Sequence, residues 1–437
     1  MRIAEIDLWH VAIPVEGTFY PAWIPGMPQT ENRFDLIRIR TESGIEGWSA
    51  GQAIAKERDG LGSLLGPYFI GEHADDLPSI RQRIRELGYL GQRMGWIEAA
   101  CWDVVGKARG KPVYELLGGH GGTVRLYAST GQVRMGPEHA AVIQARAGEG
   151  FEAVKLRVHA PALEDDLAAI RDARQGAGDK VVLGVDANQA WRVAVVADAP
   201  RWDFARALAF CKEAEGLGYL WVEEPLPMED YDGLAKLRAA TEVNLAGGEL
   251  NSSGLPEFAV MLEKGCYDWY QPDATFTGGI ADTWRIVQRV KAAGARYSPH
   301  TWTNGVGFAI NLQLFGASPF REETLLEYPY DPPWVPEVRD GILRQPFLHQ
   351  RGKLELPKAP GLGFEIDPRA LRRYGSHYFR GTRTRLAVSA VIDRGVKAAK
   401  EAGATRGTRL AARDRELLDL EAKGVDVAME SLREGTG

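Results

Sequence analysis

Three single carboxylates recur through the middle of this chain, and each follows a short apolar run. Asp186 ends VVLGVD, Glu223 lies in YLWVEEP, and Glu249 ends VNLAGGE. The intervals are 37 and 26 residues, about the length of a strand, a loop, a helix and a return loop. Successive βα units therefore bring the three carboxylates to the same end of a parallel sheet. Oxygen ligands of this kind suit a hard divalent cation.

Further ionisable residues follow the other apolar runs of this region. Lys155 and Arg157 close EAVKLR two positions apart, so both face the same side of a strand. Asp273, His300 and Glu327 follow the runs YDWYQP, ARYSP and TLL. An apolar barrel strand has no structural need for a charge at its carboxyl tip, so this recurrence indicates an active site. His300 is the best candidate for a general base, and Asp273 could orient its ring.

The elements that must position these residues are short strands alternating with helices. From about residue 123, eight apolar segments suit strands: VRLYAS, EAVKLR, VVLGVDAN, YLWVEE, VNLAGGE, YDWYQPD, ARYSPH and TLLEY. Helical stretches such as EDDLAAIRDARQGAG lie between most of them. We therefore predict an α/β fold in which residues 123–349 form a catalytic (β/α)8 TIM-type barrel.

A separate α+β capping domain is expected over residues 1–122. MRIAEIDLWHVAIPV alternates apolar and polar residues as a half-buried strand does, and FDLIRIRTESGIEGWSA predicts a hairpin. Helices are expected in ADDLPSIRQRIRELGYL and in GWIEAACWDVVGKARG, the second ending at Gly110. Residues 17–32 are rich in Pro, Gly and aromatic residues, which predicts a long loop. Tyr20 and Trp23 in this loop are candidate substrate-binding residues.

Two segments follow the barrel. Residues 350–367 are expected to form β structure that completes the capping domain. Residues 368–437 are rich in Arg, Ala, Glu and Leu, which predicts a helical C-terminal extension used for packing or assembly.

Composition excludes several classes of function. The net charge is −6 over 437 residues, and no basic cluster is interleaved with aromatic residues, so nucleic acid is not an expected partner. No apolar run approaches the ~18 residues of a membrane span. The three cysteines are far apart and lack a CxxC spacing, which favours a reducing, cytoplasmic location over a disulfide framework.

Taken together, these motifs resemble the enolase superfamily, and within it the mandelate racemase subgroup. The resemblance covers roughly residues 1–367 and rests on GKARGKPVYELLGG, KLR, VDAN, VEEP, GGE, SPH and LE in this order. It implies one Mg²⁺ per active site and a small-molecule carboxylate substrate that loses its α-proton to give an enediolate. It also implies assembly into a homo-oligomer.

The resemblance assigns roles to the residues at the strand ends. Asp186, Glu223 and Glu249 would hold the metal ion, and His300, oriented by Asp273, would remove the proton. Glu327 would donate a hydrogen bond to the substrate carboxylate, with Lys155 and Arg157 on the opposite face of the substrate.

One position departs from the family pattern. Many relatives carry Lys at both positions of the pair that is Lys155 and Arg157 here, and the second Lys is a base. A guanidinium does not readily release its proton, so Arg157 is a poor base and a good partner for an anion. This favours chemistry with one base, namely dehydration of an acid sugar to a 2-keto-3-deoxy product.

Two other functions stay open at this point. One is an isomerase, either a racemase, an epimerase or a cycloisomerase acting on a carboxylate. The other is a non-catalytic barrel, which the intact set of site residues disfavours. Asn188 could contact substrate or form a turn, Trp302 could face the pocket, and Glu224 could replace Glu223 as a ligand if the strand register shifts by one.

Overall fold

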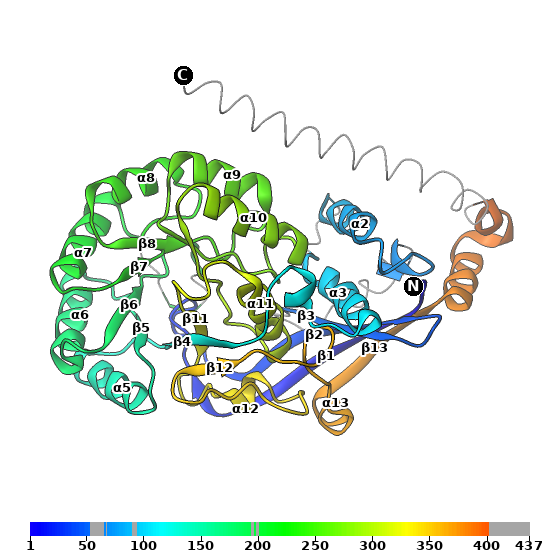
Figure 1. Cartoon of the computed structure of the whole chain (residues 1–437), viewed down its shortest axis with the longest axis horizontal. Helices are drawn as coiled ribbons and strands as arrows, with labels where there is room; N and C mark the ends of the chain where they lie inside the picture. The colour runs from blue at the N-terminus through cyan, green and yellow to red at the C-terminus, as the bar shows by residue number, and fades with distance from the viewer. Residues whose placement is uncertain (53–64, 67, 90–93, 194–195, 198–200, 402–437) are drawn as a thin grey trace, which may run out of the picture.

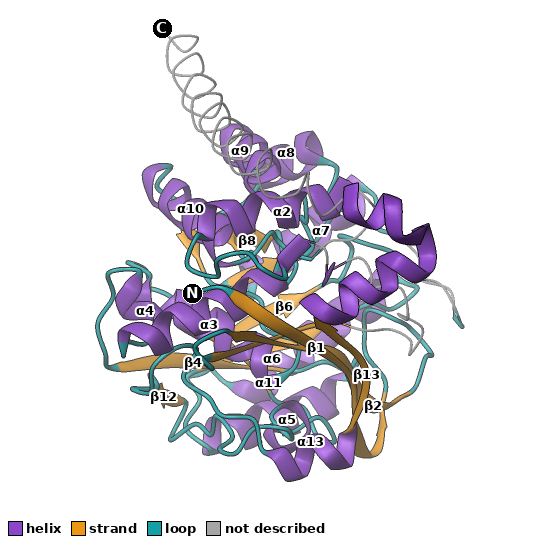
Figure 2. Cartoon of the chain, turned by 90° about the vertical axis from the view of Figure 1, so that its right-hand side faces the viewer, coloured by secondary structure: helices purple, strands orange, loops and turns teal. Residues whose placement is uncertain are grey.

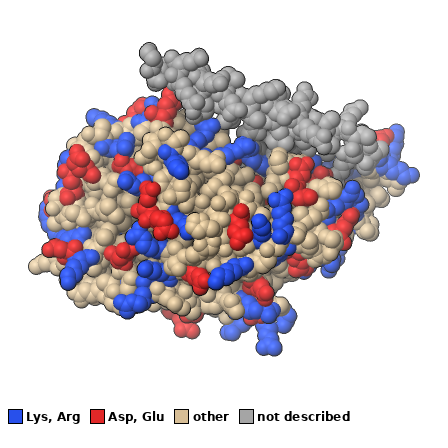
Figure 3. Space-filling view, viewed as in Figure 1, with Lys and Arg blue, Asp and Glu red and all other residues tan. Residues whose placement is uncertain are grey.

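The computed structural model shows a barrel of parallel strands ringed by helices, with an antiparallel sheet packed beside it (Figure 1). It describes residues 1–52, 65–66, 68–89, 94–193, 196–197 and 201–401. None of the helices in these ranges has both the length and the apolar character needed to span a membrane. Acidic and basic side chains are interspersed over the face in Figure 3.

The capping sheet has four antiparallel strands in the order β13–β1–β2–β3. Figure 2 shows β1, β2 and β13 side by side. Its first three strands are β1 (Ile3–Phe19), β2 (Gln29–Thr41) and β3 (Glu46–Gln52). The expected strand and hairpin are thus present. The expected loop over residues 17–32 is shorter than predicted, because β1 and β2 extend into it and leave only residues 20–28 between them.

Two amphipathic helices cover this sheet as expected, α2 (Leu77–Tyr89) and α3 (Trp96–Arg109). Gly110 ends α3 in a left-handed conformation with φ 65°, which glycine adopts without steric cost. The short helix α4 (Val113–Leu116) then leads into the barrel.

All eight expected barrel strands are present, although most are shorter than the apolar runs that predict them. They pair in parallel in the order β10–β9–β8–β7–β6–β5–β4–β11. Their bounds are β4 (Thr123–Ser129), β5 (Ala153–Arg157), β6 (Val182–Asp186), β7 (Trp221–Glu223), β8 (Asn244–Gly247), β9 (Trp269–Tyr270), β10 (Arg296–Tyr297) and β11 (Leu326–Pro329).

Helices lie between successive strands and surround the barrel (Figure 1). They are α5 (Gly136–Gly148), α6 (Leu163–Ala177), α7 (Phe204–Gly216), α8 (Tyr231–Ala240), α9 (Leu255–Lys264), α10 (Ile280–Ala292) and α11 (Gly305–Ala317). A four-residue helix, α12 (Pro336–Arg339), follows the last strand. The fold class predicted from the sequence is confirmed.

Strands β10 and β11 stand at the two ends of the strand order, and the described residues show no ladder of backbone hydrogen bonds between them. Side-chain hydrogen bonds join these two strands instead. The Ser298 hydroxyl donates to the carbonyl of Leu325 at 2.7 Å, and the Thr324 hydroxyl donates to that of Tyr297 at 2.7 Å. Thr301 adds a hydroxyl bond to the Glu327 carbonyl at 2.9 Å. These bonds hold β10 beside β11, so His300 and Glu327 approach each other from neighbouring strands.

Aromatic rings fill the barrel interior below the strand ends. Trp221 stacks on Trp269 with ring centroids 5.5 Å apart and meets Tyr127 edge-on at 5.1 Å. Gly184 makes room for this layer, because a Cβ there would lie 2.1 Å from the Trp221 ring. The layer is buried, so it closes the floor beneath the charged residues.

The C-terminal segments differ in part from expectation. Strand β12 (Lys353–Glu355) pairs with barrel strand β4 rather than with the capping sheet. Residues expected to be helical include β13 (Gly375–Thr382), which pairs with β1 and forms an edge of the capping sheet. Helix α13 (Pro368–Tyr374) precedes β13, and residues 383–401 are helical. Residues 402–437 of the expected extension lie outside the described residues.

Buried polar groups join the capping helices to the barrel. The Glu98 side chain in α3 accepts a hydrogen bond from the Ala281 backbone N–H at 3.0 Å, at the start of α10. Such a carboxylate satisfies an N–H that has no partner within the helix. Nearby, Arg81 pairs with Asp282 at 2.6 Å, and both side chains are buried. Burial raises the pKa of Glu98 to about 7 despite the Ala281 hydrogen bond.

Replacing Glu98 with Gln should stabilise the protein at alkaline pH. Because folding raises the pKa of this carboxyl from 4.5 to about 7, its ionisation opposes folding as the pH rises through that range. Glu98→Gln should therefore raise the free energy of unfolding by on the order of 3 kcal/mol at pH 8 and change it little at pH 4.5. Urea unfolding at both pH values measures this. The exposed Glu138→Gln is the control, and an equal effect of E98Q at both pH values would contradict the interpretation.

Candidate active site

The parallel ladder places charged residues of neighbouring strands side by side. Arg157 pairs in register with Asp186, and Asp186 pairs with Glu223. Beyond β8, Gly248 has φ 105° and turns the chain before Glu249. All four charged side chains are buried, so the strands deliver them together to the carboxyl end of the barrel.

His300 lies between two carboxylates. Its Nδ1 is 3.0 Å from Asp273 Oδ2, and its Nε2 is 3.4 Å from Glu249 Oε2. Asp273 is itself fixed, because its Oδ1 accepts hydrogen bonds from Thr275 and from Asn311 Nδ2. The predicted pair of His300 and Asp273 is therefore in contact, with Nδ1 directed to the orienting carboxylate and Nε2 facing the site.

The surrounding charges stabilise the protonated form of His300. Burial by itself lowers the pKa of this ring. The nearby carboxylates Glu249, Glu327 and Asp273 have the larger, opposite effect and raise the pKa to about 9. Because Glu249 contributes to the raised pKa, neutralising its charge with a bound cation favours the unprotonated imidazole that a base requires.

Lys155 lies between carboxylates and is fully buried. Its Nζ is 2.5 Å from Glu223 Oε1 and 2.7 Å from Glu327 Oε1. Burial disfavours the ammonium, but the two carboxylates outweigh this and raise the pKa of Lys155. Lys155 is therefore charged and bridges the metal-ligand candidate Glu223 to Glu327.

Glu327 is ionised in this arrangement. Burial alone would raise its pKa, but Lys155, His300 and Arg157 lower it to about 2. Its oxygens accept hydrogen bonds from the Thr301 backbone at 2.6 Å and from the Ser129 hydroxyl at 2.8 Å. Glu327 thus accepts hydrogen bonds from both groups, and its donor role toward a substrate carboxylate stays a prediction.

Arg157 is held on several sides. Its Nε donates to the Thr130 carbonyl at 2.7 Å, and its Nη1 contacts Asp186. Trp23 and Trp302 cover the guanidinium, with ring centroids 5.3 and 5.8 Å from its Cζ. Burial lowers the pKa of Arg157, but Asp186 and other carboxylates raise it more, so Arg157 remains a cation.

Two residues flanking the metal-ligand candidates have positive φ. Asn188 has φ 49°, and both its backbone N–H and its Nδ2 donate to Asp186, at 2.7 and 3.1 Å. It therefore forms a turn and orients Asp186. Glu224 has φ 48°, and burial together with Glu249 and Asp186 raises its pKa well above the ordinary value, which favours its neutral form.

The two loop aromatics differ in position. Trp23 is half-buried against Arg157 and meets Trp302 edge-on, with centroids 5.2 Å apart. Tyr20 is 51% exposed, and its backbone N–H, not its side chain, donates a hydrogen bond to Gln132 Oε1. The structure brings Trp23 and Trp302 to the other site residues but leaves the Tyr20 side chain in solvent.

The donor set fits a divalent cation by its charge. Within the part of the chain that the structure describes, six buried carboxylates lie near three buried groups that can carry positive charge, Lys155, Arg157 and His300; the carboxylates are Asp186, Glu223, Glu224, Glu249, Asp273 and Glu327. Among the described residues, no three His, Cys, Asp or Glu side chains already form a closed ligand cluster. Asp186 contacts Arg157 and Glu223 contacts Lys155 in this structure, and we predict that a bound ion would replace those contacts.

Four residues that hold site carboxylates in place were not predicted from the sequence. Ser129 and Thr301 hold Glu327, and Asn311 holds Asp273. Gln271 Nε2 donates to Glu223 Oε2 at 2.8 Å. Gln271 directly follows β9, so its position at a strand end could have predicted it as a site residue. Ser129, Thr301 and Asn311 are common polar residues, and nothing in their spacing predicts a role in the site.

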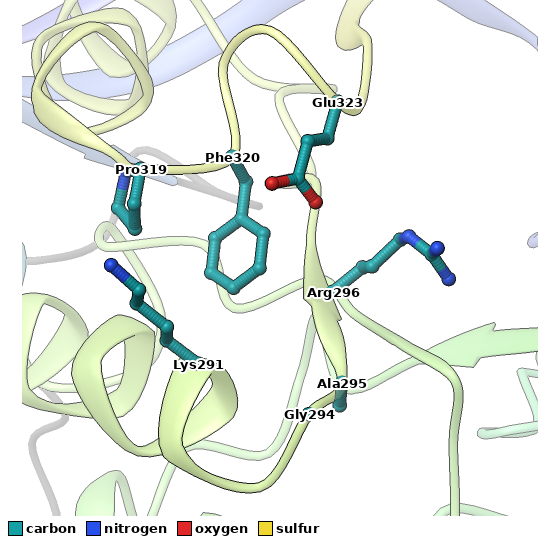
Figure 4. A pocket seen from close by; sticks show the side chains of 7 residues that line it. All are labelled: Lys291, Gly294, Ala295, Arg296, Pro319, Phe320 and Glu323. Carbon is teal, nitrogen blue, oxygen red and sulfur yellow. The ribbon is translucent and has the colours of Figure 1, made fainter.

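A separate cavity of about 260 Å³ opens at the other end of the barrel (Figure 4). It is lined by residues near the start of β10 and after α11, among them Lys291, Arg296, Phe320 and Glu323. Only one carboxylate lines it, so the donor set described above has no counterpart there.

Comparison with known proteins identifies the family. Residues 138–370 match the model described as "Enolase C-terminal domain-like", and residues 12–118 match the mandelate racemase / muconate lactonizing enzyme N-terminal domain. The chain therefore belongs to the mandelate racemase group of the enolase superfamily. Its predicted family membership is confirmed.

Individual relatives cover most of the chain. D-galactarolactone cycloisomerase of Agrobacterium fabrum is 30% identical over 78% of this chain and 92% of its own length. L-talarate/galactarate dehydratase of Salmonella typhimurium is 26% identical over 79% and 83%. A solved structure of the latter, liganded with Mg and L-lyxarohydroxamate, superimposes with a TM-score of 0.73 at 24% identity, covering 87% of this chain and 95% of that one, which shows the shared fold.

Replacing Lys155 with Met should destabilise the fold. The change leaves Glu223 and Glu327 buried without the cation that bridges them, and breaking such a buried pair costs about 3–5 kcal/mol. Urea unfolding in the presence of EDTA measures the loss. Lys212→Met, at an exposed position of α7, is the matched control. A K155M variant as stable as K212M would show that this bridge contributes nothing.

Proposed function

We propose that this chain uses His300 to remove the proton next to the carboxylate of a sugar acid and then eliminates the β-hydroxyl to give a 2-keto-3-deoxy acid. The observation that carries the proposal is the His300–Asp273 pair beside Glu249, within a buried excess of carboxylates. Relatives with 26% identity are named dehydratases of L-talarate/galactarate and of D-galactonate, which supports this reaction type.

The residues divide into a metal-holding set and a proton-transfer set. Asp186, Glu223 and Glu249 hold one Mg²⁺, with Asn188 and Gln271 orienting two of them. When bound, Mg²⁺ supplies a Lewis acid that holds the substrate carboxylate and stabilises the charge of the enediolate.

His300 moves the proton. Its Nε2 takes the α-proton as the pair of C–H electrons enters the enediolate. Collapse of the enediolate breaks the bond from the β-carbon to oxygen, and the hydroxyl leaves as water after receiving a proton from His300. The enol that remains ketonises to the 2-keto acid. Arg157, a fixed cation, binds substrate oxygens on the other face and removes no proton.

Cycloisomerisation is the second candidate function. The Agrobacterium fabrum relative, 30% identical, is named a cycloisomerase. That reaction class also starts with abstraction of an α-proton, and it does not require the second base that Arg157 cannot provide. Racemisation by two bases is disfavoured for the same reason.

We also propose a substrate class, a cellular location and a state of assembly for this protein. Relatives of this chain are named L-talarate/galactarate dehydratase and D-gluconate dehydratase, and these names refer to small sugar acids. We propose the same class of substrate for this protein. The described cysteines, Cys101, Cys211 and Cys266, are buried and free, which supports a reducing cytoplasm. We also propose that the chain assembles with copies of itself.

Incubating the purified protein with Mg²⁺ and a library of aldonic and aldaric acids tests the reaction. Dehydration predicts 2-keto product from at least one acid, dependent on Mg²⁺ and abolished by EDTA. The same library run in D₂O separates the alternatives. Incorporation of deuterium at the α-carbon without keto product favours isomerisation, and neither signal from any acid would contradict both proposals.

Replacing His300 with Asn should remove turnover without removing the metal. Because Nε2 is the proposed base and Asn has no basic nitrogen, we expect kcat to fall by at least about a thousandfold. Mg²⁺ should stabilise the variant in thermal unfolding at least as much as it stabilises the wild type, because the cationic form of His300 disfavours an ion at Glu249. Asn311→Ala, which leaves His300 in place but loosens Asp273, should retain part of the activity. Substantial turnover by H300N would mean that another group is the base.

A further inference from the structure

The loop between β1 and β2, residues 20–28, reaches from the capping unit to the strand ends of the barrel. Trp23 in this loop covers the Arg157 guanidinium at 5.3 Å, and Trp302 from the barrel covers it at 5.8 Å. An indole face attracts a cation and restricts its orientation. The position of this loop therefore sets one wall around Arg157.

Trp23 also belongs to an aromatic cluster contributed by distant segments. Phe19 at the end of β1 stacks on Trp302 at 5.6 Å and lies 6.1 Å from Trp23. Trp334, which follows β11, contacts both Phe19 and Trp302 at about 5.5 Å. Gly131 leaves the space for this stack, since a Cβ there would lie 2.4 Å from the Phe19 ring and 2.7 Å from Trp302.

Two different barrel loops bind the backbone of one loop residue. The Ala22 N–H donates to the Gly131 carbonyl at 2.8 Å, in the segment after β4. The Ala22 carbonyl lies 3.0 Å from Nδ1 of His159, in the segment after β5. A carbonyl only accepts hydrogen bonds, so Nδ1 of His159 is the donor. Ala22 is buried, at 3% exposure, so losing this donor leaves a carbonyl unsatisfied away from water.

His159 is thus connected to Arg157 in two ways. It follows Arg157 by two residues along the chain, and its ring fixes Ala22, the neighbour of Trp23. Strand β5, which carries Arg157, is therefore joined through His159 to the loop of residues 20–28, whose Trp23 covers Arg157.

We propose that His159 is a positioning residue that docks residues 20–28 onto the barrel and so fixes Trp23 over Arg157. The consequence for substrate rests on the proposed function, in which Arg157 binds oxygens of the sugar acid. The docking itself does not depend on it. Among the described residues, the His159 ring bonds to the Ala22 carbonyl and to none of the metal-ligand candidates.

Hydrogen–deuterium exchange of peptides covering residues 20–28 tests the docking without any substrate. In His159→Ala, the backbone amides of this segment, including that of Ala22, should exchange at least about fivefold faster than in the wild type, the change expected from loss of one hydrogen bond. His159→Asn is the matched control, because its Nδ2 is placed like Nδ1 of His and should retain the slow exchange. Unchanged exchange in H159A would overturn the docking role.

A second pair of variants covers the case in which H159A does not fold. His159→Gln keeps an amide but places its donor one bond further out, so it should exchange faster than H159N. Gly131→Ala disturbs the same cluster from the other segment, through the close approach to Phe19 and Trp302, and should also speed exchange in residues 20–28. Slow exchange in both variants would contradict the proposal.

Steady-state kinetics with whichever sugar acid the wild type turns over tests the consequence for Arg157. The proposed function has Arg157 bind substrate equally in the ground and transition states, so H159A should raise KM about five- to tenfold and change kcat less than about twofold. H159N should restore KM. Faster exchange with an unchanged KM would show that docking of the loop does not govern the substrate site. If no acid is turned over, the exchange data still decide the docking role, and only the proposed function fails.

Discussion

An imbalance of buried charge governs the carboxyl end of this barrel. Among the described residues, six carboxylates are buried here together with three possible cations, Lys155, Arg157 and His300. Burying charge without a partner is costly, and the raised pKa values of Asp186, Glu224 and Glu249 reflect that cost. The arrangement carries an excess of negative charge that a dication would reduce, and such a site suits metal-assisted removal of a proton from a carboxylate substrate.

The rest of the fold holds these charges in place. Parallel strands set Arg157, Asp186 and Glu223 at one level, and hydroxyl bonds hold β10 beside β11, where His300 and Glu327 lie. An aromatic layer closes the floor below, and Trp23 and Trp302 cover Arg157 at the side. The capping unit therefore covers one cation of the site, Arg157, while the barrel carries the proposed base, His300.

Much of this could be predicted from the sequence because barrel strands are local patterns. Each apolar run with an ionisable residue at its end specifies both a strand and a site residue, as VVLGVD does for Asp186. Strand β13 could not be predicted in this way, because its pairing with β1 joins residues about 370 positions apart and its neighbours are helical. Asn311 and His159 act through contacts between separate segments, and no spacing marks those. Glu327 was located from the sequence, but its ionised state depends on Lys155, whose contact only the three-dimensional structure provides.

Calorimetric titration of Mg²⁺ into the metal-free protein tests the central claim most directly, since that claim is that a dication offsets part of the buried negative charge. The account predicts one ion bound per chain, with the binding lost or weakened at least about tenfold when Glu223 is replaced by Gln, and retained when the exposed Glu138 is replaced instead. Absence of binding by the wild type, or an E223Q variant that binds Mg²⁺ as well as the wild type, would contradict it.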